Sequence, residues 1–94
     1  MEDEEVFSDT HFLVHRWLNQ GLIDGLRIDH PDGLLDPEQY FRRLRNYSPE
    51  VWILAEKILH PGERLRSSWP VQGTTGYEFL NTVLHLLIDP KAEP

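Results

Sequence analysis

Two short apolar runs, each closed by a carboxylate, constrain the fold of this chain more than any other feature. Residues 25–29 and 51–56 have the length and composition of strands, and a helical pattern lies between them. A strand-helix-strand crossover returns the chain in its original direction, so the two strands are predicted to be parallel. Asp29 and Glu56 would then emerge at the same edge of one sheet, which is the geometry of an active site.

The spacing of the two acids fits one unit of a β/α barrel. Asp29 and Glu56 are 27 positions apart, which leaves room for a turn, a helix of about three turns and a second strand. Adjacent strands lie about 4.8 Å apart, close to the roughly 5 to 5.5 Å between the two carboxyl groups of a retaining glycosidase. The alternative is that Asp29 is a turn residue and that Glu56 pairs with Lys57 or Arg27 on a solvated rim.

The local sequence around both acids resembles a known family. Residues 25–30 (GLRIDH) resemble the nucleophile segment of the alpha-amylase family, in which an arginine stands two positions before the catalytic aspartate. The longer strings 21–34 (GLIDGLRIDHPDGL), 56–59 (EKIL) and 73–81 (GTTGYEFLN) together resemble the maltooligosyl trehalose synthases, one branch of that family. This resemblance covers almost the entire chain. It implies an intramolecular transglucosylase, an isomerase that converts the reducing-end α-1,4 linkage of a maltooligosaccharide into an α,α-1,1 (trehalose) linkage with retention.

The resemblance also implies roles for individual residues. Asp29 would be the nucleophile and Glu56 the acid/base, and Glu56 follows five consecutive apolar residues, the environment that a proton donor needs. Arg27 would lie on the same side of the strand as Asp29 and hold that carboxylate charged and oriented. The substrate-binding candidates stand beside the acids: His30, Asp32 and Lys57. Structural alternatives are a turn cap before the next proline for His30 and a solvated rim charge for Lys57.

Other candidate ligand contacts are weaker. Trp52 and Trp69 could stack on sugar faces, although Trp52 lies in an apolar run and core packing is the favoured interpretation for it. His11 and His15 are one helical turn apart, but no third ligand completes a metal site. No metal and no cofactor is predicted.

The expected fold class is α/β, a fragment of a TIM (β/α)8 barrel with about two β/α units, two parallel strands and three helices. Residues 1–94 would form part of the catalytic domain, because a complete barrel needs about 250 residues. The expected order is helix 8–20, strand 23–29, helix 37–46, strand 51–56, a long loop over 61–76, and a helix that opens at the capping box 75–78 and ends at Pro90. The third acid of the alpha-amylase family has no matching position, so the chain is expected to be a central fragment of the barrel.

Helix boundaries follow from capping signals. Ser8 or Asp9 is the candidate cap of the first helix, and Gly21 is its stop. Residues 36–39 (DPEQ) predict a capped start with proline at the first helical position. Residues 75–78 (TGYE) predict a second capping box. The first helix carries the apolar residues Phe12, Leu13, Trp17 and Leu18.

Charge and composition exclude several function classes. The formal net charge of −7 argues against a nucleic-acid binder, and the cluster Arg42, Arg43 and Arg45 is interpreted as a solvated helix face. No apolar run reaches the roughly 18 residues of a membrane span. The acidic start is the reverse of a signal peptide, and the chain has no cysteine, so a cytoplasmic location is expected.

Three functional hypotheses remain open at this point. The chain is a catalytic fragment of a synthase acting on maltooligosaccharides, part of another amylase-family transglycosylase or hydrolase, or a noncatalytic remnant that serves as an interaction module. By itself the 94-residue chain is expected to be inactive. It is also expected to be marginally stable or to self-associate, because missing barrel units would leave the 51–55 run incompletely covered.

Overall fold

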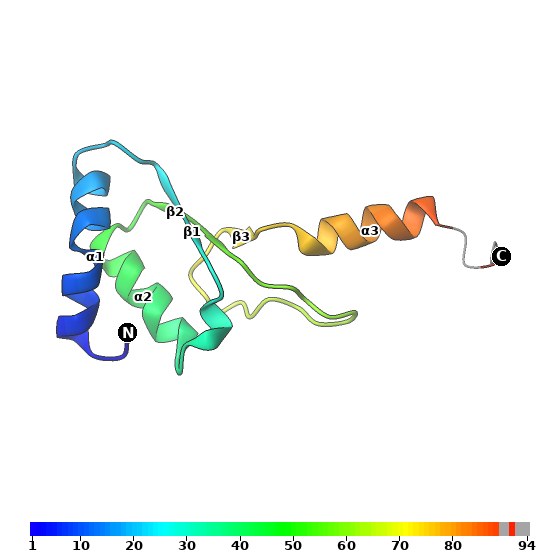
Figure 1. Cartoon of the computed structure of the whole chain (residues 1–94), viewed down its shortest axis with the longest axis horizontal. Helices are drawn as coiled ribbons and strands as arrows, with labels where there is room; N and C mark the ends of the chain where they lie inside the picture. Colours follow the sequence, from blue (N-terminus) through cyan, green and yellow to red (C-terminus); the bar gives the residue numbers. More distant parts are fainter. Residues whose placement is uncertain (89–90, 92–94) are drawn as a thin grey trace.

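The chain forms a small parallel sheet with two helices on one face and a third helix beyond it. The computed structural model describes residues 1–88 and residue 91. Its elements are, in order, α1 (Glu4–Asn19), β1 (Gly25–Ile28), the 3-10 turn η1 (Pro31–Gly33), α2 (Pro37–Tyr47), β2 (Trp52–Ala55), β3 (Gly73–Thr74) and α3 (Tyr77–Leu87). The strands lie in the order β1-β2-β3, and both pairs are parallel (Figure 1). The predicted α/β class and the three helices are therefore confirmed.

The number of strands differs from the prediction. The segment 61–76 was expected to be a loop, but it contains β3, which pairs with β2 through Leu54 with Gly73 and Ala55 with Thr74. A strand of two residues has no alternation that a sequence pattern can reveal. The prediction of two strands is wrong for this reason.

The first helix begins earlier than predicted and ends at Asn19, one residue before the predicted end, with Gly21 as the predicted stop. Asp3 is the cap, and its carboxylate accepts the backbone N–H groups of positions 5 and 6. Ser8 and Asp9 therefore lie inside the helix. At the other end Gly21 has φ +69°, and the N–H of Leu22 donates to the carbonyl of Trp17. This is a Schellman stop, which requires the left-handed backbone that glycine adopts without cost.

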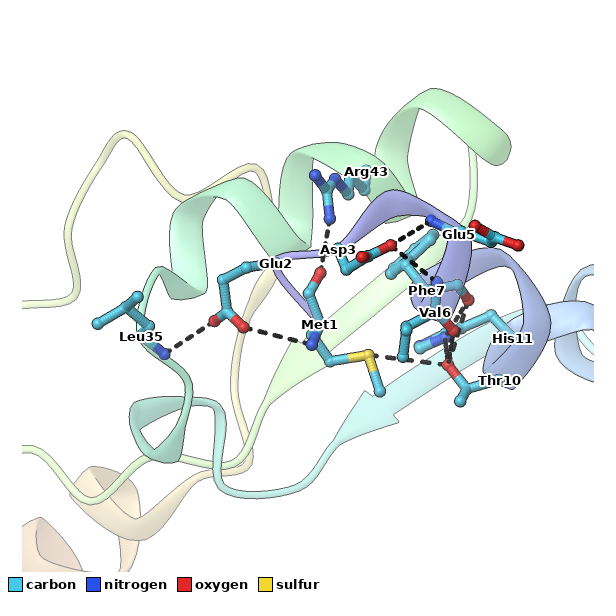
Figure 2. Close-up of polar contacts among 10 residues, drawn as sticks. All are labelled: Met1, Glu2, Asp3, Glu5, Val6, Phe7, Thr10, His11, Leu35 and Arg43. Atoms are coloured by element: carbon cyan, nitrogen blue, oxygen red, sulfur yellow. Dashed lines mark hydrogen bonds and ion pairs between the residues drawn. The ribbon is translucent and has the colours of Figure 1, made fainter.

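The N-terminus is tied to the region around α2 (Figure 2). The guanidinium of Arg43 donates to the carbonyl of Met1 at 2.6 Å, and the carboxylate of Glu2 accepts the N–H of Leu35 at 3.0 Å. These contacts hold the start of α1 beside the second helix. Arg43 is consequently not part of a fully solvated face.

The predicted start of α2 is confirmed, because Pro37 is its first residue and the carboxylate of Asp36 accepts the N–H of Gln39 at 3.0 Å. The helix ends at Tyr47, one residue later than predicted.

The core lies between the helices and one face of the sheet. The buried apolar residues are Phe7, Tyr40, Phe41, Leu44, Val51, Ile53, Ala55 and Trp69.

The buried stripe of α1 is aromatic and partly polar. It consists of Phe7, His11 and His15, whereas Phe12, Leu13 and Trp17 are exposed. These three buried residues are spaced four apart, so they share one helix face. Histidine counts as a polar residue in a hydrophobicity pattern, so the pattern does not show which face of α1 is buried.

Only one face of the sheet is covered. Val51, Ile53 and Ala55 are buried, but Trp52 is 59% exposed and Leu54 is half-buried on the opposite face. The expectation of incomplete cover for 51–55 thus holds for one face. The helix α3 projects away from the rest of the chain (Figure 1) and has no buried residue. Pro90, its predicted end, lies outside the described residues.

No helix in the described part of the chain is both long enough and apolar enough to cross a membrane.

Candidate active site

Asp29 and Glu56 lie at the same edge of the sheet, each directly after its strand. Ile28 and Ala55 are register partners, and the N–H of Glu56 donates to the carbonyl of Ile28 at 2.8 Å. The two acidic residues are therefore neighbours at the carboxyl ends of adjacent parallel strands. In β/α enzymes this edge is where substrate binds.

Arg27 lies on the open face of the sheet. Its register partner is Leu54, and strand alternation places Arg27 and Asp29 on the same side. The Arg27 side chain lines a hollow of about 320 Å³ at the start of α3, together with Thr75, Gly76, Tyr77 and Leu80. Within residues 1–88, no ion pair joins Arg27 to Asp29. The arginine therefore contributes to this hollow in the structure, and its predicted hold on the carboxylate stays a prediction.

The carboxylate of Glu56 reaches across to the segment that follows Asp29. One of its oxygens accepts the backbone N–H of His30 at 3.1 Å. His30 has a left-handed backbone (φ +46°), and a Cβ at Gly33 would lie only 2.8 Å from the His30 ring. Glycine at that position lets the imidazole pack against the turn. The turn beside the proposed nucleophile is thus compact and is tied to Glu56.

Lys57 and Asp32 form a short ion pair near the strand ends. The ammonium of Lys57 lies 2.7 Å from an oxygen of Asp32 and 3.7 Å from an oxygen of Glu63. It also lies 5.8 Å from the centre of the Trp69 ring, and only 14% of the Lys57 side chain is exposed. The hydrogen bond to Asp32 raises the pKa of Lys57. The alternative of a solvated rim charge for Lys57 is therefore wrong.

Glu63 is the residue of this cluster that the sequence did not single out. It lies in the loop after β2, and its pKa is lowered by the N–H of His60, which donates to its carboxylate at 3.0 Å, and by the charge of Lys57. No periodicity marks a residue in such a loop. The sequence feature that could have identified Glu63 is its position six residues after Lys57.

The burial of the two tryptophans is the reverse of the prediction. Trp69 is buried and packs at 5.1 Å, ring centre to ring centre, on Phe41 of α2. It is therefore a core residue and not a sugar platform. Trp52 is exposed because strand alternation places it opposite Ile53 and Ala55, so the prediction of core packing for Trp52 is wrong in this chain.

The start of α3 is capped differently from the prediction. Gly76 (φ +98°) occupies the cap position, and no side chain caps the helix. The Thr74 hydroxyl donates to the carboxylate of Glu78, whereas the buried Thr75 hydroxyl has no hydrogen-bond partner among the residues that the structure describes. The predicted capping box at 75–78 is therefore wrong, because Thr75 lies one position before the cap.

Comparison with known proteins identifies the proteins that this chain resembles. Over 93 residues, 98% of the chain, the sequence is 46% identical to a Mycobacterium tuberculosis protein named "Putative maltooligosyl trehalose synthase". The structure of the present chain superposes on the maltooligosyltrehalose synthase from Arthrobacter ramosus with a TM-score of 0.91 and 48% identity over 95% of the chain. The chain is homologous to a segment of maltooligosyl trehalose synthase.

The similar synthases come from different organisms, and the similarity covers only a small part of each synthase. A structure described as a Sulfolobus tokodaii hypothetical maltooligosyl trehalose synthase matches 97% of the chain with a TM-score of 0.85 and 45% identity. The chain spans only 12% of the length of the curated relatives and of the solved structures that it matches. No protein-family model matches the chain.

Proposed function

We propose that this chain is part of the (β/α)8-barrel catalytic domain of a maltooligosyl trehalose synthase and supplies two of its catalytic carboxylates. The observation that carries the proposal is the adjacency of Asp29 and Glu56 at the ends of paired parallel strands. It is supported by 46 to 48% identity to proteins with that name over nearly the whole chain. The substrate would be a maltooligosaccharide.

In the proposed first step, Asp29 attacks the anomeric carbon at the reducing-end linkage while Glu56 protonates the leaving oxygen. The α-1,4 bond breaks, a glycosyl-Asp29 ester forms, and the terminal glucose is released with its new hydroxyl hydrogen taken from Glu56. Retention requires two carboxyl groups about 5 to 5.5 Å apart. Adjacent strands supply about that separation.

In the proposed second step, the anomeric hydroxyl of the freed glucose attacks the anomeric carbon of the glycosyl group that is esterified to Asp29, and the bond from that carbon to the Asp29 oxygen breaks. Glu56, now a carboxylate, removes the hydroxyl proton, Asp29 departs, and an α,α-1,1 linkage forms. The glucose must react before water does, so the site has to retain it and exclude solvent.

Neighbouring residues would support this chemistry. We propose that Arg27, on the Asp29 side of β1, helps to keep that carboxylate ionised and oriented. His30, whose backbone already binds Glu56, is a candidate for hydrogen bonds to sugar hydroxyls. Asp32 and Lys57, the other two candidate substrate contacts, form an ion pair with each other.

Two alternatives give different products. Another amylase-family transglycosylase or hydrolase would release new α-1,4 chains or free glucose. A noncatalytic interaction module would be indifferent to the identity of residue 29. The strand-end pair Asp29 and Glu56 favours a catalytic origin over the module, because such a module needs no paired acids.

A transplant experiment tests the proposal. The 94-residue chain replaces the homologous segment of the Arthrobacter ramosus synthase, and the hybrid is incubated with maltohexaose while reducing ends and products are followed by chromatography. We expect loss of reducing ends in the hybrid and no turnover with Asp29→Asn or Glu56→Gln. The isolated chain, tested in parallel, is expected to be inactive.

The controls separate folding from chemistry. Asn81→Asp, on an exposed face of α3, serves as a matched single change outside the strand ends. A hybrid that folds but gives no nonreducing product contradicts the proposal. So does full activity of the folded Asp29→Asn hybrid.

A further inference from the structure

Two ties connect the segments that carry Asp29 and Glu56. The first is the hydrogen bond from the N–H of His30 to the carboxylate of Glu56, at 3.1 Å. The second is the ion pair between Lys57 and Asp32, at 2.7 Å. Both ties therefore run from the end of β2 to the turn that follows β1, and they leave from consecutive residues.

The second tie lies on the helix side of the sheet. Lys57 approaches the ring of Trp69, which is buried against Phe41 of α2. Side chains of consecutive extended residues point to opposite faces, so Glu56 and Lys57 hold the turn from different sides. A turn held from both sides has less freedom to rotate than one held by a single hydrogen bond.

The ammonium of Lys57 is already occupied. Besides Asp32 it has Glu63 at 3.7 Å, and 14% of its side chain is exposed. A sugar hydroxyl could recruit this ammonium only in competition with two carboxylates. The Lys57 side chain is largely covered, whereas 47% of the Asp32 side chain and 38% of the Glu63 side chain are exposed, so the lysine is the fixed member of the cluster.

We propose that Lys57 is a positioning residue whose ion pair with Asp32 fixes the turn carrying Asp29 relative to Glu56. Through Glu63 and Trp69 the same side chain also anchors the loop that follows β2. This inference rests on the proposed function for its catalytic consequence, but its structural part stands on this chain alone. It replaces direct sugar binding as the role of Lys57 and Asp32.

The structural part is tested in the 94-residue chain by amide hydrogen exchange. In Lys57→Met and in Asp32→Asn, we expect protection of the His30 amide to fall about tenfold, because the turn gains freedom. The amide of Ile53, which donates to the side chain of Gln72, should keep its protection. Arg64→Met is the matched control, since it removes one positive charge from an exposed side chain of the same loop.

The exchanged pair Lys57→Asp with Asp32→Lys provides the rescue. It restores opposite charges at the same positions, so we expect partial recovery of His30 protection. Unchanged His30 protection in both single variants overturns the inference. Equal loss at His30 and Ile53, with no recovery in the exchanged pair, overturns it too, because that pattern describes general unfolding.

The catalytic part is measured in the hybrid enzyme. Misplacement of the turn should lower kcat about tenfold or more and leave KM within about twofold, since positioning acts on the transition state. A rise in KM with unchanged kcat would instead assign Lys57 to sugar binding and overturn the inference. If the unsubstituted hybrid is inactive, the proposed function fails, whereas the His30 exchange result still decides the structural part.

Discussion

His11 of α1 and Tyr40 of α2 meet inside the interface of the two helices, with the imidazole Nε2 2.7 Å from the phenol oxygen. The other ring nitrogen of His11 lies 2.9 Å from the carbonyl of Phe7. One turn further along α1, His15 stacks on Tyr47 with ring centres 3.7 Å apart. Two histidines therefore serve as packing residues between helices.

This interface should make stability depend on pH. Burial lowers the pKa of His11 and of His15, and the nearby His11 lowers that of His15 further. Below the ordinary histidine pKa of about 6.5, the unfolded chain binds more protons than the folded one, so the free energy of unfolding falls as the pH falls. The expected loss is at most about 1.4 kcal/mol per pH unit for each histidine, measured by urea unfolding.

His15→Phe separates this effect from the titration of carboxylates. Phenylalanine keeps a ring to stack on Tyr47 and removes one titrating group, whose Nε2 atom has no hydrogen-bond partner in the described part of the chain. The variant should lose less stability than the unsubstituted chain between about pH 7 and about pH 5. Parallel curves for the two proteins would show that His15 does not titrate in this window.

Tyr40→Phe should destabilise the helix interface. It removes the hydroxyl partner of His11 and leaves a buried ring nitrogen unsatisfied, at a cost of about 1 to 3 kcal/mol. Tyr47→Phe is the matched control, because Tyr47 contributes its ring and the described hydrogen bonds do not include its hydroxyl. Equal unfolding midpoints for the two variants would contradict a structural role for the hydrogen bond.

Arg45 should be far more important for stability than Arg42. Its guanidinium donates to the carbonyls of Pro49, Val51 and Pro70, which holds the start of β2 and the approach to β3. This is a correction to the interpretation of the arginine cluster as a solvated face. Arg45→Met is expected to cost about 2 to 4 kcal/mol, because the partly buried carbonyls of Val51 and Pro70 lose a charged donor.

The comparison variant for this prediction is Arg42→Met. Arg42 is exposed, with Glu38 at 3.8 Å and the Ser68 carbonyl at 3.3 Å, so its loss should cost less than about 1 kcal/mol. Thermal or urea unfolding of the two variants gives the difference. A similar loss from both would mean that Arg45 adds no more than a surface charge.

Self-association should occur through α3. Its exposed apolar side chains include Phe79, Leu86 and Leu87, and none of the residues of this helix is buried. Leu87→Glu should lower the mass of the assembly measured by light scattering, because it places a charge in the apolar surface. Asn81→Glu adds the same charge at an exposed polar position of α3 and should leave the mass unchanged. A chain that is monomeric at every concentration contradicts this prediction.

The sequence alone determined the three helices, the first two strands and the order of these five elements. The apolar runs that end at Asp29 and Glu56, the capped start at Asp36, and the stop at Gly21 are signals carried by neighbouring residues. Parallel pairing followed because a helix between two strands returns the chain in the same direction. The adjacency of the two acids was predictable for the same reason.

Only the tertiary structure decided which side chains are buried and which charges meet. Trp69 lies in the core, Arg45 binds the distant carbonyl of Pro70, Lys57 pairs with Asp32, and α1 buries two histidines in preference to its leucines. Each of these contacts joins residues far apart in the chain or depends on which face a neighbouring element covers. Periodicity describes a single element, so it cannot specify the surface that the element will meet.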